Sequence, residues 1–190
     1  MHLPNHETLP LLNYRMAAVA IGHLALEHTL AWDEIPSIEI FFDGKQVIEG
    51  NATTFTNGAI ESAILHCRAL LEFLGLGEKN QTTLAERKDR RRGDDVGVEH
   101  FGNLSRVSIA TAVQAYPGPR IDAESALAYV MYLANKGLAH TTTTFNQHDE
   151  GAKLLEIAFR GVPVLLINNF YIPLGLELPA YELQSRTRVV

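Results

Sequence analysis

The stretch that decides the fold reads AIESAILHCRALLEFLGLG and spans residues 59–77. Apolar side chains recur along it at helical spacing, which predicts an amphipathic helix that buries one stripe in a core. Asn57-Gly58 marks its start, and Gly75 and Gly77 are typical helix-stop residues. The predicted buried stripe comprises Ile60, Ala63, Ile64, Cys67, Leu71 and Leu74.

Three further segments have helical patterns. A helix is expected over residues 11–32, with a stripe of Leu12, Val19, Leu26 and Leu30. Asp122 is a suitable N-cap for a helix over residues 123–140, and Asn146 for one over residues 147–159.

The clearest β signal is SIEIFFDGKQVIEG, residues 37–50, where Asp43-Gly44 supplies the turn of a two-residue hairpin. Pro36 separates this hairpin from the helix before it. The fold class that follows is mainly α: a four- to five-helix bundle with a small β-hairpin insertion at about residues 37–49, in a single domain over residues 1–190.

Other segments are less distinctive. Residues 94–101 could form a short helix, and residues 104–116 mix β-branched residues with alanine and fit either a helix or a strand. Gly161 and Pro163 are expected to break or kink the last long helix.

Composition narrows the class of protein. The chain has 190 residues, 46% of them hydrophobic and 20% charged, as in soluble globular domains. The net charge of −6 argues against coating of nucleic acid by the overall field but leaves room for a local basic patch. Residues 16–26 are too short an apolar run to span a membrane, and no secretory signal precedes them. The single cysteine, Cys67, fits a reducing cytoplasm, so a cytoplasmic protein without membrane partner is expected.

The segment Asn135-Lys136-Gly137-Leu138-Ala139-His140 is the first candidate for chemistry. Lys136 and His140 are four residues apart and share a helix face, with Asn135 to one side. An imidazole beside a cation could act as general acid or base at a phosphodiester. Lysine and histidine in a last turn also complement the helix dipole, which is the plainer interpretation.

Two segments carry a family resemblance. HCRALLEFL (residues 66–74) and NKGLAH (residues 135–140) resemble small bacterial helical proteins and, more loosely, the HEPN superfamily of helical bundles. The resemblance implies ribonuclease toxins or RNA-processing enzymes, dimeric, with an arginine a few positions before a histidine. His140 matches the histidine, whereas Asn135 stands where the arginine is expected and Lys136 is one residue late.

A basic run follows the second helix. It could contact RNA phosphates, although a solvated face is the commoner role of such a run and no aromatic residue interleaves it. Its candidate nucleic-acid-binding residues are Arg87, Lys88, Arg90, Arg91 and Arg92.

His66 and Arg68 offer a second polar pair. His66 lies among apolar neighbours and is expected to be a satisfied core or interface residue. Glu61, Arg68 and Glu72 share a charged face, which predicts a surface ion pair, and Arg68 is the candidate to replace the arginine missing at position 135.

No metal or cofactor is expected. His23 and His28 point to different sides of a helix, and His2 and His6 lie near the terminus with a proline between them. The chain shows no phosphate-binding glycine loop, no nucleophile elbow and no dinucleotide fingerprint.

Two functions stay open. One is RNA binding or cleavage centred on His140, with Asn135 and Lys136 as electrostatic or positioning partners. The other is a non-catalytic protein-interaction or dimerisation module. A homodimer is expected because Tyr129 and Leu133 extend apolar character onto a second side of the helix over residues 123–140.

Overall fold

The computed structural model describes residues 7–87, 93, 95–138 and 150–181. Five α-helices and two antiparallel β-ribbons lie in these ranges, which confirms a mainly α fold with a hairpin insertion. In chain order the elements are α1 (Thr8–Ala31), β1 (Ser37–Phe42), β2 (Lys45–Asn51), α2 (Thr53–Leu74), β3 (Leu76–Glu78), β4 (Leu84–Glu86), the 3₁₀ turn η1 (Val98–His100), α3 (Ile109–Gln114), α4 (Arg120–Tyr132), the π-helix η2 (Leu133–Leu138), α5 (Gly151–Leu166) and the π-helix η3 (Ile167–Tyr171).

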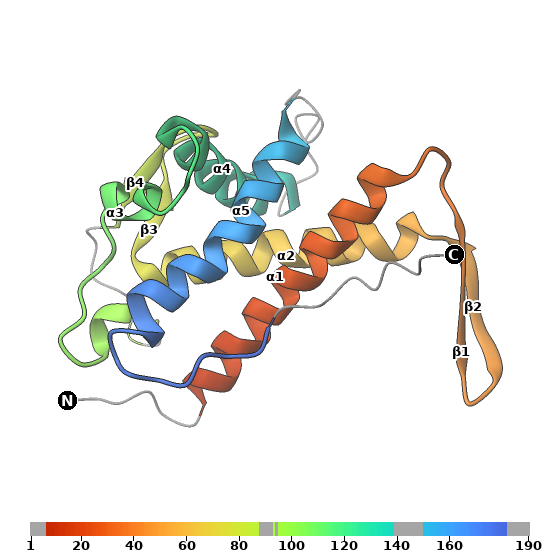
Figure 1. Cartoon of the computed structure of the whole chain (residues 1–190), viewed down its shortest axis with the longest axis horizontal. Coiled ribbons are helices and arrows are strands. Elements are labelled where there is room, and N and C mark those ends of the chain that lie inside the picture. Colours follow the sequence, from red (N-terminus) through yellow and green to blue (C-terminus); the bar gives the residue numbers. More distant parts are fainter. Residues whose placement is uncertain (1–6, 88–92, 94, 139–149, 182–190) are drawn as a thin grey trace.

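Helix α2 lies at the centre of the bundle. Helix α1 crosses it on one side, α4 packs against it on the other, and α5 contacts α1, α2 and α4 (Figure 1). The expected α2 stripe is buried, with Ile60 partly exposed. Aromatic rings close the core near the end of α2, where Phe170 meets Phe73 at 5.2 Å and Phe101 at 5.4 Å between ring centroids, both edge to face. Helix α2 therefore contacts the three other long helices of the described chain, α1, α4 and α5.

The crossing of α1 and α2 depends on Gly22. A Cβ at this position would lie 2.2 Å from the Cβ of Ala63 and 2.9 Å from the carbonyl oxygen of Ala59. Only a residue without a side chain lets the two helices approach so closely. The expected α1 stripe is buried at Leu12, Val19 and Leu26, but Leu30 is 60% exposed because α1 extends beyond α2 there.

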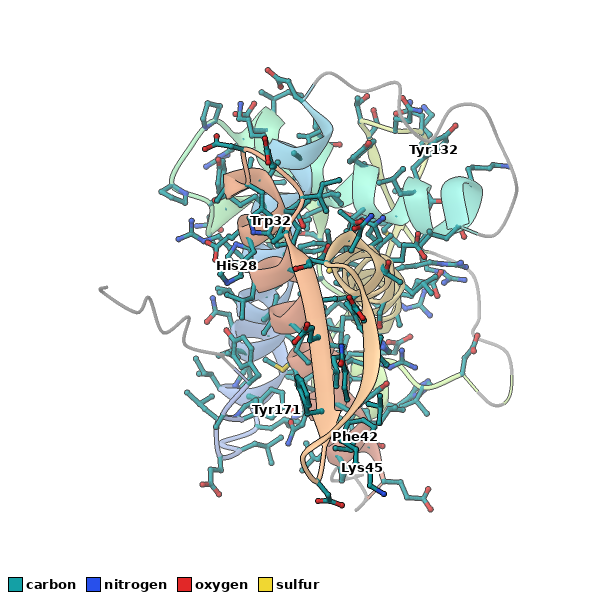
Figure 2. All side chains as sticks on the ribbon, turned by 90° about the vertical axis from the view of Figure 1, so that its right-hand side faces the viewer. His28, Trp32, Phe42, Lys45, Tyr132 and Tyr171 are labelled. Atoms are coloured by element: carbon teal, nitrogen blue, oxygen red, sulfur yellow. The ribbon has the colours of Figure 1, made fainter. Side chains whose placement is uncertain are left out.

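The β1–β2 hairpin is confirmed, with Asp43 (φ 50°) and Gly44 (φ 77°) in the turn. It ends at Asn51, two residues later than expected, and the register shifts between Ile40 and Phe41. The hairpin projects from one end of the molecule (Figure 1), with Phe42 and Lys45 at its tip, far from Trp32 at its base (Figure 2). Apart from the pairing of its two strands, the hairpin contacts α2 through β2 in the described part of the chain.

The β3–β4 ribbon was not expected from the sequence. Gly75 ends α2 in a left-handed conformation (φ 93°), as its stop signal predicts, and the chain then pairs Leu76–Glu78 with Leu84–Glu86. Glu124 of α4 accepts a hydrogen bond from the backbone N–H of Leu84 at 3.1 Å. This bond fixes the ribbon to α4.

Two expected helix starts are wrong. Helix α2 begins at Thr53, not at Asn57-Gly58, because β2 leads directly into it and the Ala52 N–H bonds the Pro36 carbonyl at 2.9 Å. Asp122 is not the N-cap of α4. The helix begins at Arg120 after Pro119, and Asp122 lies in its first turn, 3.6 Å from the Lys153 ammonium.

Gly161 and Pro163 were expected to break or kink the last long helix, and the break does not occur. Helix α5 continues through Pro163 to Leu166 and passes into the π-helix η3, whose buried Phe170 and Tyr171 anchor it in the core. The Asn146 cap lies outside the described residues. Helix α4 likewise changes to a π-helix at Leu133 instead of running as an α-helix to position 140.

The ambiguous segment 104–116 is part loop and part helix. Ser108 caps α3 by accepting a hydrogen bond from the Thr111 N–H at 3.1 Å, so residues 109–114 become helical. The Val107 N–H bonds the carbonyl of Leu74 at 2.8 Å, which holds the preceding loop against the end of α2. Within residues 94–101, the helical part is η1 alone.

Two helical stretches are long and apolar enough to cross a membrane by length and composition, α1 and residues 151–171. In the most apolar part of residues 151–171 over half of the residues are buried, whereas in that of α1 only 33% are. Core helices of soluble proteins have the same character, so this observation carries little weight by itself. What distinguishes α1 is that four of its large apolar side chains, Leu11, Tyr14, Ile21 and Leu30, remain exposed in the described part of the chain.

Substitution of Gly22 by alanine is expected to lower the free energy of unfolding by about 1–3 kcal/mol, because the new methyl group overlaps Ala63 and α2 backbone. Gly58→Ala in α2 is the matched control: no atom lies within 4 Å of its added Cβ, and about 0.5–1 kcal/mol of stabilisation is expected. Urea unfolding followed by circular dichroism measures both. Equal stability of the two variants would contradict a close helix crossing at Gly22.

Candidate functional site

The residues expected to carry chemistry lie at the end of α4. Asn135 and Lys136 are in the π-helix η2, and Lys136 is exposed. The side-chain amide of Asn135 donates a hydrogen bond to the carboxylate of Glu78, the last residue of β3. His140 lies outside the described residues.

The bond to Glu78 determines what Asn135 can do. Its amide donor is directed at a carboxylate of the same chain, so it fastens η2 to the β3–β4 ribbon. A carboxylate at this position also opposes the approach of a phosphate group. The described part of the candidate site therefore contains an amide–carboxylate pair where a phosphodiesterase would need an unopposed cationic donor.

The first residue of the basic run belongs to an ion-pair network. One carboxylate oxygen of Glu72 lies 3.1 Å from Nε of Arg68 and 3.2 Å from Nη1 of Arg87. The expected Arg68–Glu72 ion pair is therefore present, and Glu72 partly neutralises Arg87 as well. Lys88, Arg90, Arg91 and Arg92 lie outside the described residues.

Arg106 extends this network and was not singled out from the sequence. Its Nε lies 2.7 Å from Oε1 of Glu99, its Nη1 donates to the carbonyl of Arg87, and its side chain covers Gly75. The three partners are separated from it by 7 to 31 positions, so no local pattern marks the cluster. Its arrangement ties the loop before α3 to the β3–β4 ribbon.

The structure does not bring Arg68 to Asn135. The Arg87 N–H bonds the carbonyl of Gly75 at 2.9 Å, so Arg87 lies at one end of the β3–β4 ribbon. Glu78 pairs with Leu84 at the other end. Glu78 is the third residue after Gly75, about 10 Å away along the strand. Arg68 is bound to Glu72 at the Arg87 end, so it does not replace the arginine missing at position 135.

A cavity of about 390 Å³ lies beside the network, between the first turns of α1 and the end of α2. Two cations, Arg15 and Arg87, line it, but three carboxylates, Glu7, Glu72 and Asp95, line it too. This balance of charge does not favour a phosphate ligand.

His66 lies between α2 and α1. Its Nδ1 lies 3.1 Å from Nη1 of Arg15 and accepts a hydrogen bond from it, and the edge of the Tyr14 ring meets its ring at a centroid distance of 5.2 Å. Burial, and then the charge of Arg15, lower the pKa of His66 below its ordinary value. His66 is therefore neutral at physiological pH and serves the helix contact, as expected of an interface histidine.

Within the described ranges, no three His, Cys, Asp or Glu side chains are grouped so that they could hold a metal ion. Cys67 is buried and not in a disulfide, and burial raises the pKa of its thiol well above the ordinary value. It is not placed to act as a nucleophile.

The most distinctive surface is apolar. We define the outer face as Leu11, Tyr14, Ala18 and Ile21, which lie along one side of α1. Tyr14 is 61% exposed, and Leu11 and Ile21 are each close to half exposed. Sequence reasoning missed this face, although the signal was present: Arg15 is the only charged residue between Thr8 and Leu26.

The hairpin carries a second apolar surface. Ile38, Ile40 and Phe42 alternate along β1 and share one face with Ile48, the partner of Ile40. Phe42 is 64% exposed and Phe41, on the other face, 53%. A two-stranded hairpin is marginally stable in water by itself, so an uncovered apolar face favours contact with another molecule.

By contrast, the second side of α4 is covered within the chain. Tyr129, Val130 and Met131 are buried, and α4 packs against α2, α3, α5 and the β3–β4 ribbon. The apolar character from which a dimer was expected is thus used in the core, and α4 gives no argument for a dimer.

A pH-dependent stability is expected from His66. Because its folded pKa is lowered from 6.5, the unfolded chain binds the proton more readily, and stability is lost as the pH falls through about 6.5. Wild type should lose more unfolding free energy between about pH 7.5 and 5.5 than His66→Gln. His28→Gln, a substitution at an exposed position of α1, should keep the wild-type slope. Parallel curves for wild type and His66→Gln would contradict this role.

The chain matches no protein-family model, no curated protein and no solved structure. The HEPN-like resemblance of residues 66–74 and 135–140 therefore stays a prediction.

Proposed function

We propose that the chain is a non-catalytic protein-interaction module of the cytoplasm that binds its partner through the outer face. The observation that carries this proposal is that α1 is apolar around its whole circumference, yet Leu11, Tyr14 and Ile21 stay close to half exposed or more after α1 has packed against α2 and α5. A helix with apolar side chains on every side normally lies buried. We therefore infer that a partner covers the outer face when it binds.

The anatomy of the outer face supports this role. Large apolar side chains form its centre, and the charged residues Glu61, Arg68 and Glu72 lie to one side along α2. Protein interfaces have such a charge-depleted core and a polar rim. Tyrosine is enriched among the residues that dominate binding, so Tyr14 is the expected anchor.

A photo-crosslinker in place of Ile21, expressed in the source cells, is expected to form an adduct with a polypeptide. Ile121 of α4, 65% exposed, is the matched control position and should form none. Adding Tyr14→Glu should abolish the Ile21 adduct, because a buried charge without a partner opposes binding. No polypeptide adduct at Ile21, or equal adducts at both positions, would contradict the proposal.

A second candidate function is RNA binding or cleavage centred on His140, in line with the HEPN-like resemblance. The π-helix η2 favours it, because π-helical turns occur frequently at functional sites and this one holds Asn135 and the exposed Lys136, five and four residues before His140. The amide–carboxylate pair of Asn135 and Glu78 speaks against cleavage.

For this second candidate, His140→Ala is expected to abolish cleavage of RNA by the purified protein while the melting temperature stays unchanged. His28→Ala on α1 is the control and should cleave like wild type. A ribonuclease activity that survives His140→Ala would exclude a site at this position, and absence of activity in wild type would leave the interaction module as the function.

A further inference from the structure

The outer face has the spacing of a helix-pairing seam. Leu11, Tyr14, Ala18 and Ile21 are separated by three, four and three residues, as are the a and d positions of paired helices. Small side chains, Ala17 and Ala18, occupy its middle, where they permit a close approach of a second helix. The face therefore fits another helix better than a loop or a strand.

The charges of α1 select its partner and orientation. Arg15 is the only charged residue of α1 near the outer face, and it already donates a hydrogen bond to His66. The face therefore has little charge with which to attract a strongly charged partner. Two copies of this face are complementary to each other, since neither brings a charge that the other must oppose. An aligned parallel pair would place Glu27 beside Glu27, whereas an antiparallel pair with its axis near Ala18 separates the two Glu27 by roughly 27 Å along the helix.

The area required shows that the hairpin takes part. A standard interface buries about 800 Å² per partner. The three large side chains of the outer face, each roughly half exposed, offer on the order of 300 Å² if a whole aromatic side chain buries about 150–250 Å². Phe42 and Ile48, which share one hairpin face and are 64% and 38% exposed, add roughly 200 Å² by the same measure. Together the two apolar surfaces come to roughly 500 Å², close to the non-polar share of a standard interface, which is a little over half of its area.

We propose that a second copy of this chain covers the outer face, as a two-fold dimer in which α1 pairs antiparallel with the α1 of its partner. This inference rests on the proposed function and names its partner. With the axis near Ala18, Tyr14 packs on the partner's Ile21. The hairpin follows the C-terminal end of α1 (Figure 1), so in an antiparallel pair it lies toward the N-terminal part of the partner's α1.

Light scattering of the full chain at micromolar concentration tests the dimer. Wild type is expected at about 42 kDa, twice the 21.0 kDa chain, and Ile21→Glu at 21.0 kDa with an unchanged melting temperature. Ile121→Glu, at a more exposed site on α4, should stay dimeric. Phe42→Ser should raise the dimer dissociation constant by at least about tenfold in sedimentation equilibrium.

A wild-type mass of 21.0 kDa at every concentration, or an Ile21→Glu variant that stays dimeric, overturns the inference. So does flotation of monomeric wild type with phospholipid vesicles, which would make a lipid surface the occupant. If wild type is monomeric but the Ile21 crosslinker captures a different polypeptide in a Tyr14-dependent way, the dimer fails and the proposed function stands. If no polypeptide is captured either, both fail.

Discussion

The close contact of α1 with α2 at Gly22 is the constraint on which the rest of the structure depends. The two backbones lie so close at Gly22 that a Cβ atom there would overlap the Cβ of Ala63. That approach turns Leu12, Met16 and Val19 into the core, while Tyr14 and Ile21, beside this buried stripe, remain exposed. The outer face is therefore a consequence of the same crossing that builds the bundle.

Polar contacts fix α1 at two further places. Arg15 bonds His66 of α2, and Asn13 accepts a hydrogen bond from the hydroxyl of Tyr171 in η3. Burial raises the pKa of Tyr171 to about 12, so this hydroxyl keeps its proton and remains a donor. With α1 held at both contacts, its outer face is rigid, and a rigid surface loses less entropy when it binds.

The β3–β4 ribbon performs the corresponding task on the other side of α2. Glu72 joins Arg68 and Arg87 at one end, and Glu78 holds Asn135 at the other. Most of the described side chains that sequence reasoning assigned to RNA are thus engaged in structural contacts. The fold uses these charged groups to hold a loop-rich region together, whereas the outer face of α1 is an apolar part of the described surface that remains exposed.

The sequence was informative where structure is local. Asp43-Gly44 predicted the hairpin because a two-residue turn depends on two residues, and the α2 stripe followed from helical periodicity. It was uninformative where contacts are distant: Asn135 and Glu78 are 57 residues apart, and strands of three residues, such as β3, have no pattern of their own. Leu30 shows a third limit. Periodicity predicts that it belongs to the apolar stripe of α1, but not how far along α1 the neighbouring helices cover that stripe, and Leu30 is exposed.

The account's central claim is that α1 pairs on one side with α2 and on the other with a second copy of itself. A spin label on His28→Cys measures this most directly by pulsed electron resonance, because Cys67 is buried and the label enters at position 28. Ten residues separate this position from the axis near Ala18, so an antiparallel pair predicts a distance of about 30 Å between labels. A distance of about 10 Å, as a parallel pair would give, or no distance between copies at all, would contradict it.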